Sequence, residues 1–191
     1  RFIGAGHIGG IPVPVILGLH AQYMLGKKIP GKKKEIHKRV KELDGEYSIY
    51  KKEHGLIDFN DMINHAVELL SSNPSILDTV RTRYKYVLVD EFQDTSRINF
   101  KLLSLLVPGE NPSLMVVGDD WQSIYGFRNA RVEYIVNMKR YFPEVKTYML
   151  TRNYRSKSEI LQVAGRIIKK NRFRTKKKVF ATMGKGGEVR G

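Results

Sequence analysis

The feature that most constrains the fold of this chain is an alternation of short β-rich runs with helical stretches in its central part. The β-rich runs are Tyr86–Val89, Leu114–Val117 and Thr147–Leu150, and the helical stretches between them lie around Ile98–Leu106 and Val132–Phe142. Strands that alternate with helices predict a parallel sheet with right-handed crossover connections. The sequence therefore predicts an α/β layer architecture.

Acidic residues follow the first two of these runs. Asp90-Glu91 follows the first, and Gly118-Asp119-Asp120 ends the second. Polar groups just past the carboxyl ends of parallel strands are where such sheets bind ligands. The adjacent carboxylates of Asp90 and Glu91 after an apolar strand fit a magnesium–nucleotide site, because one can hold Mg²⁺ and the other can polarise the water that attacks a phosphate. An Asp-Glu pair alone also ends many strands, so the inference depends on the longer string Val87–Asp94.

Helices are expected in the regions on either side, except in residues 1–30, which have no clear pattern. Residues 1–30 are rich in glycine and apolar residues, and residues 31–57 have apolar residues at helical spacing that predict a long amphipathic helix with a basic start. A second helix is expected over Asp58–Leu70, and Asn73-Pro74 marks a turn. After Leu150 a new unit is expected, because Ser156 to Glu159 has the spacing of a capping box before another helix.

The charge of the chain favours a polyanionic partner. Lys and Arg outnumber Asp and Glu by 34 to 19, which gives a net charge of +15, and the tail beyond Lys169 is strongly basic. Nucleic acid fits this surplus first and an acidic membrane surface second, while a generally basic surface is the alternative without a partner. The longest apolar stretch, Ile8–Leu19, contains two prolines and is shorter than the roughly 20 residues of a membrane span. The chain has no cysteine, which excludes disulfides and thiolate metal sites and fits a reducing cytoplasm.

Four blocks carry a family resemblance. They are Leu56–Met62, Asp90–Asp94, Val117–Ala130 and Asn153–Ser156. In that order they resemble the block upstream of Walker B, the Walker B block (motif II), motif III and motif IV of UvrD/Rep-type superfamily 1 DNA helicases. The string Gly118–Gln122 is especially similar to the helicase IV branch.

The resemblance implies a fold and an activity. The fold is an α/β, parallel-sheet, RecA-like P-loop NTPase motor core, present in part. Residues 1–57 correspond to the helical inserted 1B subdomain, 58–150 to part of the 1A motor domain and 151–191 to the start of the 2A domain. The implied activity is ATP-dependent 3′–5′ DNA helicase or translocase movement, with ATP and Mg²⁺ as cofactors, single-stranded DNA or duplex/single-strand junctions as partner, no membrane, and a cytoplasmic location.

The resemblance also implies roles at the nucleotide. Asp90 would support Mg²⁺, and Glu91 would lie at the metal and act as the general base for water. Gln93 would lie near the nucleotide, and Gln122 would sense the γ-phosphate and couple it to the DNA site.

Motif IV would supply two further nucleotide contacts. Tyr154 would stack on adenine, and Arg155 would act as an arginine finger. A guanidinium group suits that role because it is a planar, always charged donor of hydrogen bonds to phosphate oxygens. Arg152 falls outside the matching position.

Motif III would also contact single-stranded DNA, through Tyr125, Phe127 and Arg128. An aromatic face stacks on any base, which gives affinity with little sequence preference. Many relatives have Trp at the position of Phe127, so a weaker contact is expected there. A core position is the alternative for Tyr125, and packing is the expected role of Trp121.

The phosphate-binding loop Gly-x-x-x-x-Gly-Lys-Ser/Thr does not occur in these 191 residues. Family members place that loop upstream and further motifs downstream, so we expect an internal piece of a longer protein with little ATPase activity alone. One alternative is a single-stranded-DNA-binding module with a vestigial nucleotide site, which the intact set Asp90, Glu91, Gln122 and Arg155 argues against. The other is the helicase part of a helicase-nuclease, which shares these motifs.

Overall fold

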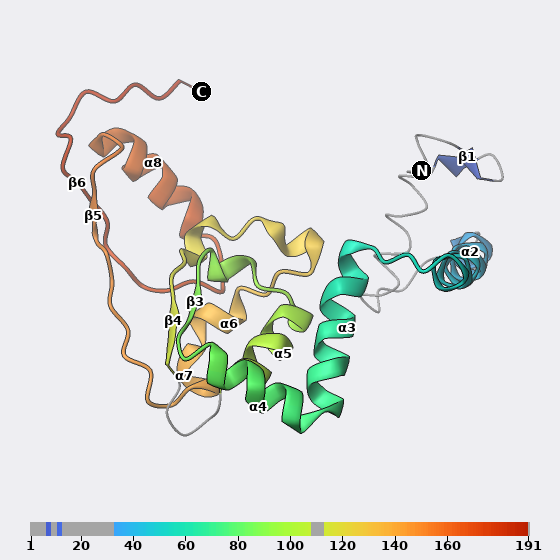
Figure 1. Ribbon diagram of the computed structural model, residues 1–191. Coiled ribbons are helices and arrows are strands. Elements are labelled where there is room, and N and C mark those ends of the chain that lie inside the picture. Colours follow the sequence, from blue (N-terminus) through green and yellow to red (C-terminus); the bar gives the residue numbers. More distant parts are fainter. Residues whose placement is uncertain (1–6, 9–10, 13–32, 108–112, 191) are drawn as a thin grey trace. The chain divides into compact units, whose positions relative to one another are not determined.

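The computed structural model of the chain describes residues 7–8, 11–12, 33–107 and 113–190 (Figure 1). The chain divides into two compact units, residues 1–61 and 62–191. Most of the glycine-rich apolar region and of the apolar stretch Ile8–Leu19 lies outside the described residues. None of the described helices is both long and apolar enough to cross a membrane.

The first unit contains a short antiparallel pair and the predicted long helix. Strand β1 (His7–Ile8) pairs with β2 (Ile11–Pro12), and helix α2 spans Lys33–Glu53. The chain leaves α2 through Gly55, whose φ of 61° lies in the left-handed region that glycine adopts without strain. The long helix predicted between residues 31 and 57 is therefore confirmed.

The block Leu56–Met62 comprises the segment before helix α3 (Phe59–Ser72) and the first residues of that helix. Asp58 Oδ1 accepts hydrogen bonds from the backbone N–H groups of Asn60 and Asp61, both at 2.9 Å, and Asp61 Oδ2 accepts from the Asp58 N–H at 2.8 Å. This reciprocal arrangement is that of a capping box. Lys51 Nζ from α2 lies 2.8 Å from Asp58 Oδ2 and 2.6 Å from Asp61 Oδ2, and its hydrogen bonds hold the pKa of both carboxyls below the usual range.

The second unit is built on a parallel strand pair joined by a helix. Strand β3 (Val87–Val89) pairs in parallel with β4 (Leu114–Val116), with Leu88 opposite Met115. Helix α5 (Arg97–Leu106) lies between them in the chain, and its N-cap Ser96 accepts a hydrogen bond from the Asn99 N–H at 3.3 Å. The first two predicted strands and the helix that connects them are thus confirmed.

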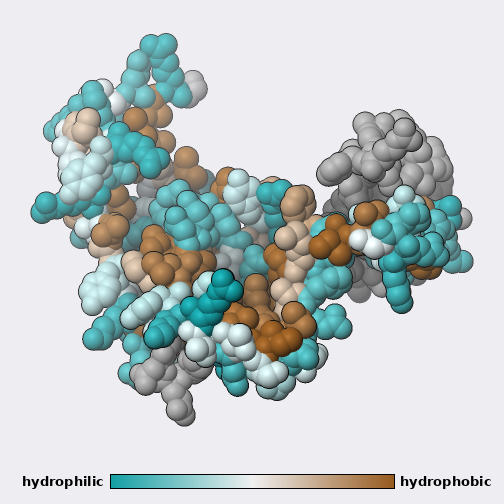
Figure 2. All heavy atoms as spheres, viewed as in Figure 1, coloured by the Kyte–Doolittle hydropathy of each residue, from teal (hydrophilic) through white to brown (hydrophobic). Residues whose placement is uncertain are grey.

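One face of this strand pair carries the core. The buried cluster is formed by Phe92, Leu103, Val107, Tyr134 and Met138, with the inward residues of both strands packed against it. The opposite face is open, since Leu88 is 71% and Met115 58% exposed. Apolar side chains therefore appear at the surface of the unit among polar ones (Figure 2).

The helices that precede β3 and follow β4 in the sequence differ from those predicted. Helix α4 (Pro74–Arg83) follows the Asn73-Pro74 turn and was not predicted, although proline at the first helical position favours a helix start. The single helix expected over Val132–Phe142 is two short ones, α6 (Glu133–Val136) and α7 (Met138–Tyr141). They are separated at Asn137, whose φ of −107° and ψ of 31° are not helical.

The third predicted strand is wrong. Residues 147–150 form no strand, and Tyr148 is 84% and Leu150 92% exposed. A strand needs a hydrogen-bonded neighbour, and none of the described strands lies beside this segment. Pairing occurs instead just after it, where β5 (Arg152–Asn153) runs parallel to β6 (Phe180–Ala181). The described residues thus form a mixed helix–strand fold with small parallel pairs.

The capping box predicted at Ser156 and Glu159 is also wrong. Helix α8 spans Ser158–Ile168, and Ser156 instead donates its N–H to Asn153 Oδ1 at 2.7 Å. The Glu159 carboxylate accepts from the N–H groups of Gly187, at 2.9 Å, and Gly186, at 3.1 Å. These backbone hydrogen bonds, led by that of Gly187, lower the pKa of Glu159 from 4.5 to about 2.

The lowered pKa predicts a pH-dependent contribution of Glu159 to stability. The contribution is complete above pH 4.5, where the carboxyl is ionised in both the folded and the unfolded chain, and it is lost as the pH falls toward 2. We therefore expect the difference in unfolding free energy between the wild type and Glu159→Gln to shrink between pH 5 and pH 2.5, as measured by urea titration. Glu188→Gln, at an exposed position after β6, controls for the loss of one negative charge. A difference that stays constant over this range would contradict the assignment.

Candidate nucleotide site

The carboxyl end of β3 presents two exposed acids. Asp90 Oδ1 accepts a hydrogen bond from the Glu91 N–H at 2.8 Å, and Glu91 has a left-handed backbone with φ 49° and ψ 42°. The next residue, Phe92, is fully buried and donates its N–H to the Val117 carbonyl at 2.9 Å. The chain therefore turns sharply at Glu91, which directs Phe92 into the core and leaves the Glu91 side chain outside.

A pocket of about 310 Å³ lies beside these acids. Its lining includes Asp90, Glu91 and Asp94, together with apolar groups of the core. Asp94 Oδ1 is buried in this wall and has no hydrogen-bond partner among the described residues. A buried carboxylate oxygen of this kind has the capacity to accept a hydrogen bond or to bind a cation.

The two acids fit a bound magnesium ion. Asp90 Oδ2 and Glu91 Oε1 receive no hydrogen bond from the described residues, so one oxygen of each carboxylate is available as a ligand. No group of three or more His, Cys, Asp or Glu side chains with metal-binding geometry occurs in the described part of the chain. That is compatible with Mg²⁺, which is usually held by one or two carboxylates, water and the phosphates of the nucleotide.

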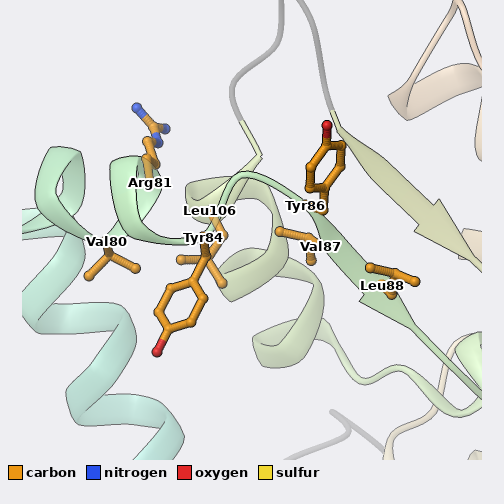
Figure 3. Close-up of a pocket in the computed structure, with 7 residues that line it drawn as sticks. All are labelled: Val80, Arg81, Tyr84, Tyr86, Val87, Leu88 and Leu106. Carbon is orange, nitrogen blue, oxygen red and sulfur yellow. The ribbon is translucent and has the colours of Figure 1, made fainter.

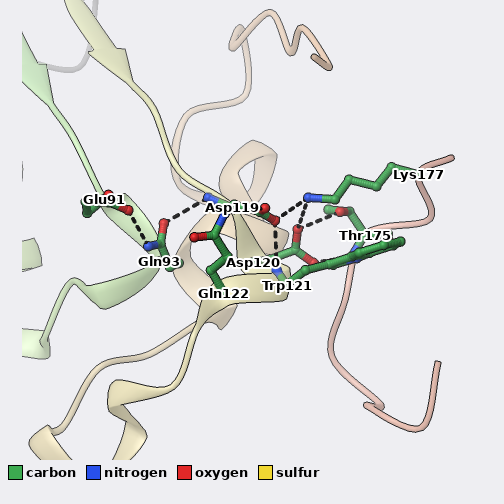
Figure 4. A network of polar contacts seen from close by, with 8 residues as sticks. All are labelled: Glu91, Gln93, Asp119, Asp120, Trp121, Gln122, Thr175 and Lys177. Carbon is green, nitrogen blue, oxygen red and sulfur yellow. Dashed lines mark hydrogen bonds and ion pairs between the residues drawn. The ribbon is translucent and has the colours of Figure 1, made fainter. Parts of the chain in front are cut away.

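Gln93 connects the loops that follow the two strands. Its side chain is only 2% exposed. Its Nε2 donates to Glu91 Oε2 at 2.7 Å, and its Oε1 accepts from the Asp119 N–H at 2.9 Å. Gln93 does not line the pocket. Its side chain lies between Glu91 and Asp119, and its two hydrogen bonds join the loops that carry them (Figure 4).

Gln122 belongs to the same network. It ends the short 3-10 helix η2 (Asp120–Gln122) that follows β4, and its exposed side chain donates from Nε2 to Asp119 Oδ2 at 2.8 Å. A continuous set of hydrogen bonds therefore joins Glu91, Gln93, Asp119 and Gln122 (Figure 4). The structure thus brings together three of the residues expected at the nucleotide, Glu91, Gln93 and Gln122.

The second acidic pair has a different environment from the first. Asp120 is buried and accepts hydrogen bonds from Thr175 N, at 2.6 Å, and Thr175 Oγ1, at 2.7 Å. Lys177 forms ion pairs with both Asp119 and Asp120. No motif in the sequence marks Thr175 or Lys177, and their only signal is the basic composition of the tail.

Tyr154 and Arg155 are not part of this network. They follow β5, Tyr154 is 69% exposed, and the Arg155 side chain is also exposed. Neither lines the pocket of Asp90 and Glu91, and no hydrogen bond joins them to it among the described residues. The structure fixes only their backbone turn, in which Asn153 Oδ1 accepts from the Arg155 N–H at 3.0 Å.

The expected DNA-contacting residues form an exposed cluster on the 3-10 helix η3 (Tyr125–Arg128). The rings of Tyr125 and Phe127 are 5.9 Å apart, and the Arg128 guanidinium lies 5.8 Å from the Tyr125 ring. Tyr125 is 39% and Phe127 71% exposed. The alternative of a core position for Tyr125 is therefore wrong.

A second pocket, of about 290 Å³, lies near the start of β3 (Figure 3). Its lining is mainly apolar and aromatic, and its single charged residue, Arg81, donates to the Leu105 carbonyl from Nε at 2.9 Å and from Nη2 at 2.7 Å. Arg81 is therefore engaged in joining α4 to the end of α5. This pocket is lined by no carboxylate, histidine or cysteine of the described residues, whereas the pocket at the other end of the strand has three carboxylates and is therefore the candidate nucleotide site.

The network leaves no room for a side chain at Gly118. A Cβ atom there would lie 2.6 Å from Gln93 Oε1 and 3.0 Å from the backbone nitrogen of Phe92. We expect Gly118→Ala to lower the free energy of unfolding by about 1–3 kcal/mol, because the buried Gln93 amide has to move. Urea unfolding followed by the fluorescence of Trp121 measures the change. Gly126→Ala, where a Cβ would meet no atom within 4 Å, is the matched control and is expected to stay near the wild type. Equal effects of the two substitutions would contradict the close packing.

Comparison with known proteins identifies the family. Residues 18–143 match the model of the UvrD/REP helicase N-terminal domain. The chain is 45% identical over 134 residues to DNA helicase II of Escherichia coli (strain K12), which covers 70% of this chain and 18% of that protein. It is 38% identical over 133 residues to ATP-dependent DNA helicase PcrA of Leuconostoc citreum, with 70% and 18% covered. It is 36% identical over 146 residues to ATP-dependent DNA helicase Rep of Salmonella typhimurium, with 76% and 22% covered. The chain thus spans about a fifth of the length of these relatives, and it belongs to the UvrD/REP helicase N-terminal domain family.

Proposed function

We propose that this chain is part of the motor of an ATP-dependent 3′–5′ DNA helicase or translocase. The observation that carries the proposal is the position of Gln93, which joins Glu91 at the end of one parallel strand to Asp119 at the end of the next. The carboxylate suited to activate water and the Gln122 amide therefore belong to one hydrogen-bonded unit. The carboxyl ends of adjacent parallel strands are where nucleotides bind in such sheets.

Each residue has a distinct role in the proposed hydrolysis. Asp90 and Glu91 hold Mg²⁺, which neutralises negative charge on the phosphates when it is bound. Glu91 also accepts the proton of the attacking water, while its hydrogen bond from Gln93 keeps the carboxylate oriented. The exposed Gln122 amide senses the γ-phosphate and couples it to the DNA site. Tyr154 stacks on adenine and Arg155 supplies positive charge in the transition state, which is compatible with the exposure of both side chains.

We further propose that the chain comprises parts of three helicase subdomains. Residues 1–57 are assigned to the 1B inserted subdomain, 58–150 to part of a RecA-like 1A motor domain and 151–191 to the start of 2A. The parallel pair of β3 and β4 with its crossover helix supports the middle assignment. The exposed face at Leu88 and Met115 supports it as well, because parallel sheets are normally covered on both faces and this one has room for further layers.

Single-stranded DNA, alone or at a duplex junction, is the proposed partner. The exposed rings of Tyr125 and Phe127 provide a stacking surface, and the adjacent Arg128 supplies positive charge. The net charge of +15 adds long-range attraction to phosphates. Binding of this kind is indifferent to sequence and sensitive to salt.

Replacing the proposed general base tests the hydrolytic role. In the complete protein that contains this chain, we expect Glu91→Gln to reduce DNA-stimulated ATP hydrolysis by about 10²–10⁴-fold, because an amide cannot accept the proton of water. ATP affinity should change little, and the chain alone should show little turnover. A coupled phosphate-release assay and a fluorescent-nucleotide titration measure the two quantities. Glu144→Gln, at an exposed acid outside the network, is the control. If Glu91→Gln hydrolyses ATP as fast as Glu144→Gln does, Glu91 is not the general base.

Truncating the exposed ring of Phe127 tests the DNA surface. We expect Phe127→Ala to weaken the binding of a labelled single-stranded oligonucleotide by an amount equivalent to about 1–3 kcal/mol, the contribution of one stacked base. Fluorescence anisotropy at about 50 and about 200 mM salt should show weaker binding of the oligonucleotide at the higher salt concentration. Tyr148→Ala removes an aromatic ring that is 84% exposed and serves as the control. An affinity independent of salt, or equal loss in the two variants, would contradict the proposed surface.

A further inference from the structure

The basic segment Arg172–Lys178 is attached to the loop that follows β4, more than 50 residues earlier in the chain. Asp120 accepts from both the N–H and the hydroxyl of Thr175, and the Trp121 Nε1–H donates to the Thr175 carbonyl at 3.2 Å. The Lys177 ammonium lies 5.0 Å from the centre of the Trp121 ring and forms ion pairs with Asp119 and Asp120 (Figure 4). The segment is therefore fixed through both its backbone and its side chains.

Lys177 differs from its neighbours in this segment. Its side chain is 14% exposed, whereas Lys176 and Lys178 on either side are exposed. The partner side chain of Asp120 is 4% exposed and that of Asp119 is 34% exposed. Removing either partner of an ion pair that is withdrawn from water leaves a buried charge without a counter-ion, which destabilises the folded state. Lys177 is thus a specific member of the network and not one more charge of a basic tail.

Asp119 is where the basic segment meets the proposed nucleotide site. Its Oδ1 receives Lys177 Nζ and the Trp121 N–H, its Oδ2 receives Gln122 Nε2, and its own N–H donates to Gln93 Oε1. Burial raises the pKa of Asp119, but the hydrogen bonds from Lys177 and Gln122 outweigh it and hold the pKa below the usual range. The carboxylate is therefore charged at neutral pH, and each oxygen holds a different partner in place.

We propose that Lys177 is a positioning residue for ATP hydrolysis, which acts through Asp119 to fix the side chain of Gln122 and the loop bound by Gln93. This inference rests on the proposed function. The basic segment thereby restrains the proposed nucleotide site. When Lys177 is bound, its ion pair restricts rotation of the Asp119 carboxylate, which in turn holds the Gln122 amide in position. When Lys177 leaves, Asp119 loses its counter-ion, and the hydrogen bond that orients Gln122 loses its fixed acceptor. Movement of the segment Arg172–Lys178 is thereby transmitted to the hydrolysis site.

The contact itself is tested with the only tryptophan of the chain, Trp121, which lies inside it. We expect Lys177→Met to shift the emission of Trp121 to longer wavelength and to increase its quenching by acrylamide, because the segment that covers the indole is released. Lys176→Met removes the same charge from the exposed neighbour and should leave both signals at the wild-type values. Circular dichroism confirms that each variant is folded. Identical spectra for Lys177→Met and the wild type would overturn the proposal.

The positioning role is tested by kinetics of the complete protein. We expect Lys177→Met to lower kcat for DNA-stimulated ATP hydrolysis by about 10–100-fold, the effect of removing a hydrogen bond to a charged group, with a much smaller change in KM for ATP. Lys177→Arg keeps the charge and should restore most of kcat, and Asp119→Asn should resemble Lys177→Met. The double variant should be no slower than either single variant, because both remove the same link.

The outcomes separate this inference from the proposed function. If the wild type hydrolyses ATP and Lys177→Met has an unchanged kcat, the positioning role is wrong and the helicase motor remains. If Lys177→Arg is as slow as Lys177→Met although both are folded, the ion pair is not the element that acts. If the complete wild-type protein does not hydrolyse ATP, the proposed function fails and the positioning role fails with it, whatever the fluorescence shows.

Discussion

The primary amide of Gln93 is the group on which the arrangement of this site depends. It is almost completely buried, so its donor and its acceptor both need partners inside the protein. The donor finds the Glu91 carboxylate and the acceptor finds the Asp119 N–H. An unpaired amide at this place costs about 1–3 kcal/mol, which is a large part of the stability of a small domain. The loops after β3 and β4 are consequently held at a fixed separation, and Gly118 supplies the space that the amide occupies.

The two acidic pairs show how similar sequences acquire different chemistry. Asp90-Glu91 and Asp119-Asp120 each follow a parallel strand and are each a pair of adjacent acids in the sequence. In the structure the first pair keeps an available oxygen on each carboxylate, whereas the second is occupied by Thr175 and Lys177. The difference arises from a segment distant in sequence. A local motif identifies where carboxylates lie, but their chemistry is decided by what the fold brings against them.

The sequence predicted the strands and helices whose apolar patterns match a buried face, and it missed helix α4 as well as the features that depend on distant partners. Strand β3, strand β4 and helix α5 are confirmed because their apolar patterns coincide with a face that is buried. The strand expected over Thr147–Leu150 has the right composition but no neighbouring strand among the described residues. The capping box at Ser156 has the right spacing, yet Asn153 binds the backbone of the turn and the glycines near residue 186 bind Glu159.

The same limit applies to the site. The resemblance identified Glu91, Gln93 and Gln122 together, and the hydrogen bonds that join them agree with that grouping. It gave no indication of Lys177, because a lysine between two other lysines has no distinguishing pattern. Only the burial of its ammonium group against Asp119 and Asp120 separates it from its neighbours.

The backbone conformation of Glu91 has a consequence for how such a site evolves. A left-handed conformation costs most residues other than glycine, asparagine and aspartate about 1–2 kcal/mol, so selection for stability alone favours those three residues at position 91. Only aspartate among them carries a carboxylate, and its side chain is one methylene shorter than that of glutamate. A protein that keeps glutamate there gives up folding stability in exchange for a reactive group on a sharp turn. Stabilising substitutions that arise at this position during laboratory evolution would therefore be gained at the expense of turnover.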